Sequence, residues 1–192
     1  EISRCDWSSD VCSSDLGKGY APAEQNKEVW HYNGPFHIET GEPLYEMTEE
    51  DYSDISLNYL LDKMKKDPAV VAITSGTPTV MGFTEDKRKE AGKQFVDVGI
   101  AEETAVALAS GIAANGGKPV YGVYSTFVQR TYDQIAQDLC INNSPATIVT
   151  FCGSVYGMND VTHLGLYDIP MMANIRSEER RVGKECRSRW TP

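Results

Sequence analysis

Short apolar runs and longer mixed segments alternate along the central part of this 192-residue chain. Four runs are apolar at nearly every position, which is typical of strands buried on both faces of a sheet; they span residues 70–74, 95–99, 119–124 and 146–151. The segments between the later runs are long enough to form helices. Strands that alternate with helices predict an α/β fold, in which a parallel sheet carries helices on both faces.

Local signals delimit the predicted helices. Thr48, which acidic residues follow, predicts the start of a helix that ends before Pro68. An Ala-rich helix is predicted over 101–115, where two glycines close it, and another over 127–141. Residues 75–92 predict a loop with a short helix.

The two ends of the chain look like a DNA sequencing adapter translated in opposite directions. Ser13-Ser14-Asp15-Leu16 can be encoded by the string TCTTCCGATCT, and the reverse complement of that string encodes Arg-Ser-Glu, which stands at Arg176-Ser177-Glu178. We therefore expect residues 1–16 and 176–192 to be adapter-derived and non-native, and we derive fold and function from the residues between them.

The remaining residues divide into two expected parts. Residues 17–47 are rich in Pro, Gly and polar residues without a sustained period, and we expect them to form a connecting segment. Residues 48–175 contain the alternating strands and helices, and we expect them to form one truncated domain. The chain is therefore expected to be a fragment of a longer enzyme.

Charge and cysteine content restrict the partners and the compartment. The two flanks carry equal numbers of acidic and basic side chains, so the formal net charge of −10 belongs to residues 17–175. This acidic balance argues against nucleic acids and anionic membranes as partners. No apolar run approaches the roughly 20 residues that span a bilayer. Cys140 and Cys152 alone lie between the flanks, which favours a reducing cytoplasmic location.

The residues that follow each predicted strand are candidates for chemistry, because parallel sheets bind ligands at the carboxyl ends of their strands. Glu102 and Glu103 open the helix after the second strand. A favourable interaction with the helix dipole explains both, and a partly buried carboxylate that exchanges protons is the alternative. Tyr124, Phe127 and Arg130 follow the third strand. They could stack on a ring and bind an anion, or only pack the start of a helix, where Arg130 could also form a surface pair three residues along the chain.

A polar glycine-containing loop follows the fourth strand and includes Asn159, Asp160 and His163. Such a loop is flexible and titratable near neutral pH, although a lone loop histidine is more often solvated or structural. His31 and His37 lie in the connecting segment, and their spacing with His163 matches no zinc site.

Several separated blocks occur together and in a fixed order. They are Gly17-Lys18-Gly19-Tyr20, Asp97-Val98-Gly99-Ile100-Ala101-Glu102, Tyr124-Ser125-Thr126-Phe127, Gln129-Arg130, Tyr132-Asp133-Gln134 and Thr162-His163. In these blocks the chain resembles the thiamine-diphosphate-dependent 1-deoxy-D-xylulose-5-phosphate synthases of the transketolase superfamily. The resemblance implies that residues 17–47 end a connecting segment and that residues 48–175 form most of a pyrimidine-binding domain.

The resemblance also implies roles for single residues around the cofactor. The Glu102 carboxyl would hydrogen-bond the pyrimidine nitrogen N1′ and so assist proton removal from the reactive carbon. Phe127 would stack on the pyrimidine, and Tyr20 would lie against the cofactor. His31 and His163 would handle protons on the substrates.

Further residues and partners follow from the same resemblance. Tyr124, Arg130, Asn159 and Asp160 would lie near the acceptor. The implied reaction decarboxylates pyruvate and joins the two-carbon unit to glyceraldehyde 3-phosphate, as a step of isoprenoid precursor and thiamine biosynthesis. The implied parent is a homodimer whose Mg²⁺ ligands lie in an upstream domain that is missing here.

Three positions depart from the family pattern. Cys152 stands where the family usually has an arginine for the acceptor phosphate, Asn159 replaces an aspartate, and Glu103 with Thr104 replaces Gln-His. Losing a charge-assisted phosphate contact weakens it by about 1.5–3 kcal/mol. A transketolase, a subunit of a 2-oxo-acid dehydrogenase and a non-catalytic interaction module therefore remain alternative functions.

Overall fold

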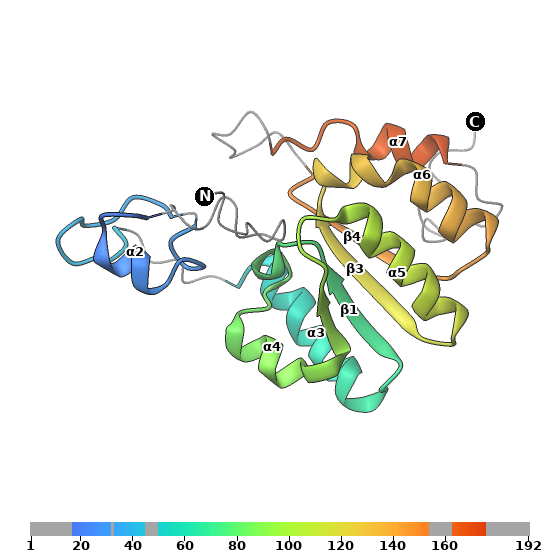
Figure 1. The fold of residues 1–192 in the computed structure, drawn as a ribbon, viewed down its shortest axis with the longest axis horizontal. Coiled ribbons are helices and arrows are strands. Elements are labelled where there is room, and N and C mark those ends of the chain that lie inside the picture. Colours follow the sequence, from blue (N-terminus) through green and yellow to red (C-terminus); the bar gives the residue numbers. More distant parts are fainter. Residues whose placement is uncertain (1–16, 32, 45–49, 154–162, 176–192) are drawn as a thin grey trace, which may run out of the picture. The chain divides into compact units, whose positions relative to one another are not determined.

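The computed structural model describes residues 17–31, 33–44, 50–153 and 163–175. The chain divides into two compact units, Glu1–Ile55 and Ser56–Pro192, which are described separately (Figure 1). The predicted site residues Asn159 and Asp160, and the predicted helix start at Thr48, lie outside the described residues. The adapter origin of the two ends stays a prediction.

The first unit contains more structure than its composition predicts. A five-residue helix, α2 (Ala21–Gln25), starts with Pro22 in its first turn, where proline is well tolerated. The Tyr20 ring lies 5.1 Å from the Trp30 ring and 5.8 Å from the Phe36 ring, measured between centroids. Phe36 also forms an isolated bridge with Pro43. A small aromatic cluster, rather than a periodic apolar stripe, therefore organises this unit.

Four parallel strands form the sheet of the second unit. They are β1 (Val70–Thr74), β2 (Phe95–Asp97), β3 (Lys118–Tyr124) and β4 (Thr147–Phe151), in the order β2-β1-β3-β4. Thr74 pairs in register with Asp97 and Gly122, and Tyr124 pairs with Phe151. The carboxyl ends of all four strands therefore meet at one edge, and the predicted α/β fold is confirmed.

One strand is shorter than predicted. β2 ends at Asp97 instead of Gly99, because Gly99 has a φ of +72°, which extended strand cannot contain. The Asp97 carboxylate accepts hydrogen bonds from the backbone N–H groups of Gly99 at 2.9 Å and Gly76 at 2.8 Å. Asp97 thus ties the loop after β1 to the loop that leads into the next helix.

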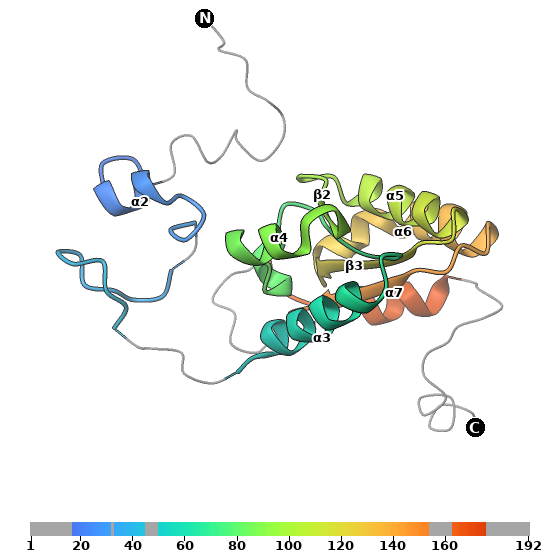
Figure 2. The same ribbon diagram turned by 90° about the horizontal axis from the view of Figure 1, so that it is seen from below.

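Helices cover both faces of the sheet, as Figure 2 shows. On one face, α3 (Tyr52–Lys66) packs Leu57, Leu61 and Met64 against the sheet, together with η1 (Pro78–Met81) and α4 (Glu85–Ala91). On the other face, α5 (Glu102–Ala114) presents buried alanines to the sheet. Small side chains let α5 approach β1 and β3 closely, which brings its first residue over the strand ends.

The segment after β3 departs from the single helix predicted over 127–141. It starts as a tight 3-10 turn, η3 (Phe127–Thr131), continues as α6 (Tyr132–Gln134) and widens into the π-helix η4 (Ile135–Ile141). The Ser110 hydroxyl of α5 donates a hydrogen bond of 2.7 Å to the Asp138 carbonyl, which helps to satisfy the backbone of the widened segment. Apolar spacing cannot distinguish these windings from a regular helix.

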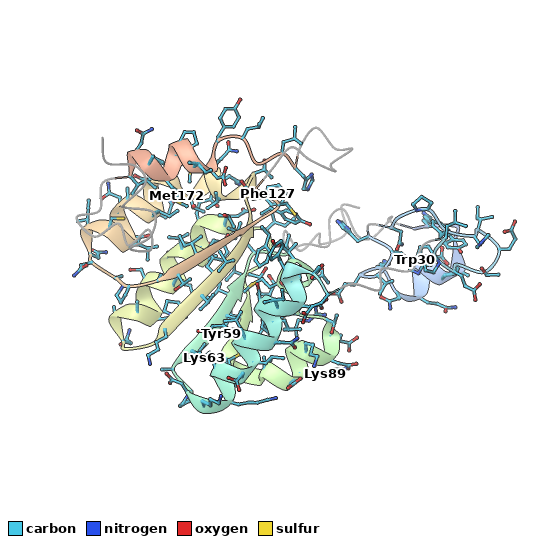
Figure 3. The ribbon with its side chains drawn as sticks, turned by 180° about the vertical axis from the view of Figure 1, so that it is seen from behind. Trp30, Tyr59, Lys63, Lys89, Phe127 and Met172 are labelled. Carbon is cyan, nitrogen blue, oxygen red and sulfur yellow. The ribbon has the colours of Figure 1, made fainter. Side chains whose placement is uncertain are left out.

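A further helix, α7 (Asp168–Asn174), is not predicted from the sequence. Its Met171 and Met172 pack against the core on the α5 face; Met172 is labelled in Figure 3. The helix is too short to carry a recognisable apolar period. Within the described residues, no helix has the length and apolar character needed to cross a membrane.

Candidate functional site

A buried carboxylate lies at the edge where the strands end. Glu102 is the first residue of α5, and it is only 2 % exposed. Its atom Oε2 has no hydrogen-bond partner in the part of the chain that the structure describes. The Arg130 guanidinium lies within ion-pair distance, with 3.1 Å between Nη1 and Oε2, but it donates no hydrogen bond to this oxygen. Oε2 therefore keeps an open acceptor position.

Three predicted site residues form an aromatic group beside this edge. The Tyr124 ring lies 5.5 Å from the Phe127 ring and 5.5 Å from the His163 ring, and 5.1 Å separates Phe127 from His163. All three contacts are edge-to-face, which is the preferred arrangement of such rings. His163 thus lies beside Tyr124, the last residue of β3, and beside Phe127, which is labelled in Figure 3.

Arg130 joins the aromatic segment to the start of α5. Arg130 pairs with Glu102 and also with Glu103, whose Oε1 lies 3.6 Å from Nε of the arginine. Among the described residues, these two glutamates are its ion-pair partners, so the surface pair three residues along the chain is not the arrangement found. The link between residue 102 and residue 130 depends on how η3 packs against α5.

A buried hydroxyl pair, missed by sequence reasoning, lies on the α5 face of the sheet. The Tyr121 hydroxyl and the Ser75 hydroxyl are 2.8 Å apart, and both residues are buried. Burial raises the pKa of Tyr121 far above its ordinary value, and the nearby Glu102 and Glu103 carboxylates raise it further, against the hydrogen bond from Ser75. The signal in the sequence was a tyrosine inside an apolar strand, which needs a polar partner.

Two side chains surround the end of β4. Cys152 is exposed and has a φ of +53°, and partial desolvation raises the pKa of its thiol. Asp168, the first residue of α7, is buried, and its Oδ2 lies 3.5 Å from the point where a side chain on Gly153 would begin. This corner therefore contains a neutral thiol and a carboxylate.

The first unit contains two other predicted site residues. Tyr20 and His31 belong to the first unit, where the Tyr20 hydroxyl is buried without a hydrogen-bond partner among the described residues and His31 is exposed. The structure thus joins Tyr124, Phe127 and His163 in one group of rings and pairs Arg130 with Glu102. Within the described ranges, His, Cys, Asp and Glu form no cluster that could hold a metal ion.

Comparisons with known proteins identify the family of the chain. The family described as "Transketolase, pyrimidine binding domain" matches residues 49–178. The chain is 41 % identical over 159 residues to the 1-deoxy-D-xylulose-5-phosphate synthase of Alkaliphilus oremlandii and 42 % identical over 155 residues to that of Acaryochloris marina. These matches cover 83 % and 80 % of the chain but 25 % and 24 % of the relatives, so the chain spans about a quarter of their length.

A solved structure extends the likeness to the fold. The protein titled "Split gene transketolase, inactive beta4 tetramer" superposes with a TM-score of 0.50 and 19 % identity, over 64 % of this chain and 40 % of that one. At this identity the likeness concerns the fold alone. The family match, the parallel sheet and the predicted resemblance agree, and the chain belongs to the family of transketolase pyrimidine-binding domains.

Proposed function

We propose that this chain is the pyrimidine-binding part of a thiamine-diphosphate-dependent carboligase of the 1-deoxy-D-xylulose-5-phosphate synthase type. The complete enzyme would decarboxylate pyruvate and join the remaining two-carbon unit to an aldehyde, as a transferase. The observation that carries this proposal is the open acceptor position on the buried Oε2 of Glu102 beside the aromatic group. The relatives named as this synthase support the same reaction.

The residues present fit half of the cofactor. A buried polar atom without a partner is costly unless a ligand satisfies it, and a protonated ring nitrogen or a shared proton would satisfy Oε2. Phe127 offers a ring face beside the same edge for stacking on a pyrimidine. Thiamine diphosphate, when bound, supplies the carbon that attacks the pyruvate carbonyl and accepts the electrons that carbon dioxide leaves behind.

The chain's own residues would then orient the reactants and move protons. Glu102 would share a proton with the pyrimidine nitrogen, and Phe127 and Tyr124 would exclude water from the ring. His163 would exchange a proton with a substrate oxygen, held in place by its contacts with both aromatic rings. We also propose that Tyr20 and His31 of the connecting segment contact cofactor and substrate, and that Asn159 and Asp160 line the acceptor.

Several features of the complete enzyme belong to the same proposal. The diphosphate and Mg²⁺ would be held by residues outside this chain. The enzyme would be a cytoplasmic homodimer that takes pyruvate and an aldehyde phosphate. A transketolase that moves ketol units between sugars is the second candidate, because Cys152 stands where the synthases usually have an arginine for the acceptor phosphate and Asn159 stands where they have an aspartate.

A chimaera tests the proposal without the complete gene. Residues 17–175 replace the aligned segment of the Alkaliphilus oremlandii synthase, and carbon dioxide release from pyruvate is measured with and without an aldehyde. We expect release that the aldehyde stimulates, and none from the 192-residue chain alone. A chimaera that ignores pyruvate but transfers ketol units would support the transketolase. A folded chimaera without either activity would contradict both candidates.

A further inference from the structure

Arg130 is the cation of the site. In the described loops that follow the four strands, residues 75–84, 98–101, 125–131 and 152–153, it is the only arginine or lysine. Its side chain is 53 % exposed, so a dissolved anion can reach the guanidinium. A planar guanidinium is the side chain best suited to a phosphate, to which it can donate two parallel hydrogen bonds.

Two successive carboxylates already form ion pairs with this cation. Glu102 lies at Nη1 and Glu103 at Nε, so the two glutamates approach different nitrogens of one guanidinium. The two partners differ in burial, because Glu102 is 2 % exposed and Glu103 is 39 % exposed. Glu102 is fixed in the core of the site, whereas Glu103 is the accessible and replaceable partner.

The charge of the surroundings does not favour a further anion. With both glutamates ionised, the group of Glu102, Glu103 and Arg130 carries a net charge of about −1, and the buried Asp168 adds a carboxylate near the end of β4. Desolvation raises the pKa of the Cys152 thiol and so favours its neutral form, which does not offset this negative charge.

We propose that Glu103 is a specificity-determining residue. By holding Nε of Arg130, it keeps the guanidinium turned toward Glu102 and competes with the anionic group of an acceptor for this cation, so that it weakens the preference of the site for a phosphorylated aldehyde over an uncharged one. The identity of the acceptor as an aldehyde rests on the proposed function. The competition between Glu103 and an anion for Arg130 does not rest on it.

Phosphate binding to the 192-residue chain tests this competition directly. The Nε–H signal of Arg130 is followed by NMR in the ¹⁵N-labelled chain, identified by its loss in Arg130→Lys, while inorganic phosphate replaces chloride at constant ionic strength. We expect Glu103→Gln to bind phosphate at Arg130 about 3–10-fold more tightly than the unsubstituted chain, because one competing charge is removed.

Glu90→Gln is the matched control. Glu90 lies on α4 and pairs with Lys65 and Lys87, so its substitution removes the same charge without touching Arg130. We expect it to leave the phosphate affinity at Arg130 unchanged. Equal affinities in Glu103→Gln and the unsubstituted chain would overturn the proposal, and so would an equal increase in Glu90→Gln. Should Glu103→Gln not fold, Glu103→Asp, which keeps the charge but shortens its reach, is expected to bind phosphate more tightly than the unsubstituted chain.

The chimaera provides a second readout and separates the two proposals. There, Glu103→Gln is expected to raise kcat/KM for glyceraldehyde 3-phosphate relative to that for glyceraldehyde by a similar 3–10-fold. An unchanged ratio in an active chimaera would overturn the inference alone. An inactive chimaera would count against the proposed function, while the phosphate titration still decides the role of Glu103.

Discussion

The two ends of the same sheet differ in whether all of their buried polar side-chain atoms find hydrogen-bond partners among the described residues. At the amino end, the Asp67 carboxylate accepts hydrogen bonds from Lys118 Nζ at 2.6 Å and from the Ala69 N–H at 2.9 Å, and Gln94 donates to the carbonyls of Asp67 and Val70. At the carboxyl end, Oε2 of Glu102 and Oγ of Ser125 are buried, and neither has a hydrogen-bond partner among the described residues.

This difference distinguishes polar groups that stabilise the fold from polar groups that are available to bind a ligand. The amino-end groups are mutually satisfied and partly exposed, so they need nothing more to be stable. A buried polar atom without a partner lowers stability and persists where another molecule completes its hydrogen bonding. The asymmetry therefore supports a ligand at the carboxyl end, where parallel sheets generally bind theirs.

The largest effect is expected from replacing the buried carboxylate of Glu102, whose Oε2 has no hydrogen-bond partner among the described residues. In the chimaera, Glu102→Gln should lower turnover about 10²–10⁴-fold, because an amide keeps the shape of the side chain but cannot exchange the proton. Its free energy of unfolding should change little, because the amide is less costly to bury than a carboxylate, and this gain offsets the loss of the ion pair with Arg130. Turnover is measured as carbon dioxide release, and stability by urea unfolding.

Glu90→Gln is again the control, because it neutralises a carboxylate that pairs with Lys65 of α3 and Lys87 of α4 and not with Arg130. It should leave turnover within a factor of about two, as surface substitutions generally do. If Glu102→Gln retained full turnover, or lost it only in proportion to unfolded protein, the two ends of the sheet would not differ in function.

A smaller effect is expected at the hydroxyl pair, where the carboxyl end is satisfied like the amino end. Tyr121→Phe leaves the buried Ser75 hydroxyl without its partner and should lower the free energy of unfolding by about 1–3 kcal/mol. The double variant Ser75→Ala/Tyr121→Phe should recover part of this loss, since no buried hydroxyl is then left alone. Urea unfolding of both variants is the measurement, and a double variant no more stable than Tyr121→Phe would contradict the account.

Much of the fold could be predicted because it depends on local pattern. The apolar run Val70–Thr74 is β1 as predicted, and the Ala-rich segment that starts near Glu102 is α5. The structure differs from the prediction in two places. There, the type of helical winding or the shortness of the helix cannot be recognised from the apolar pattern. The segment from Phe127 to Ile141 changes from 3-10 to π winding, and α7 is too short for a period.

The sequence predicts where the residues of the site lie but not how their side chains pair. The positions of Glu102 and Phe127 after strand ends pointed to the correct edge, because that follows from parallel topology. The pairing of Arg130 with Glu102 and Glu103 joins side chains far apart in the sequence, and it depends on the packing of η3 against α5. Periodicity contains no information about such a contact.

The smallest effect is expected at the amino end. Asp67→Asn keeps an oxygen for the Ala69 N–H but removes the charge that Lys118 pairs with. The hydrogen bond from Lys118, and then that from Ala69, hold the pKa of Asp67 below its ordinary value of 3.8. A carboxyl group whose pKa is lowered by folding stabilises the fold above its unfolded pKa, and this stabilisation is lost as pH falls through the folded value. The difference in Tm between Asp67→Asn and the unsubstituted chain should therefore be present at pH 7, shrink as pH falls below about 3.8, and shrink in high salt because the pair is exposed. The loss in free energy of unfolding at pH 7, measured with urea, should also be smaller than the loss caused by Tyr121→Phe. A larger loss, or one that does not depend on pH, would mean that the amino end also contains a group on which the stability of the fold depends strongly.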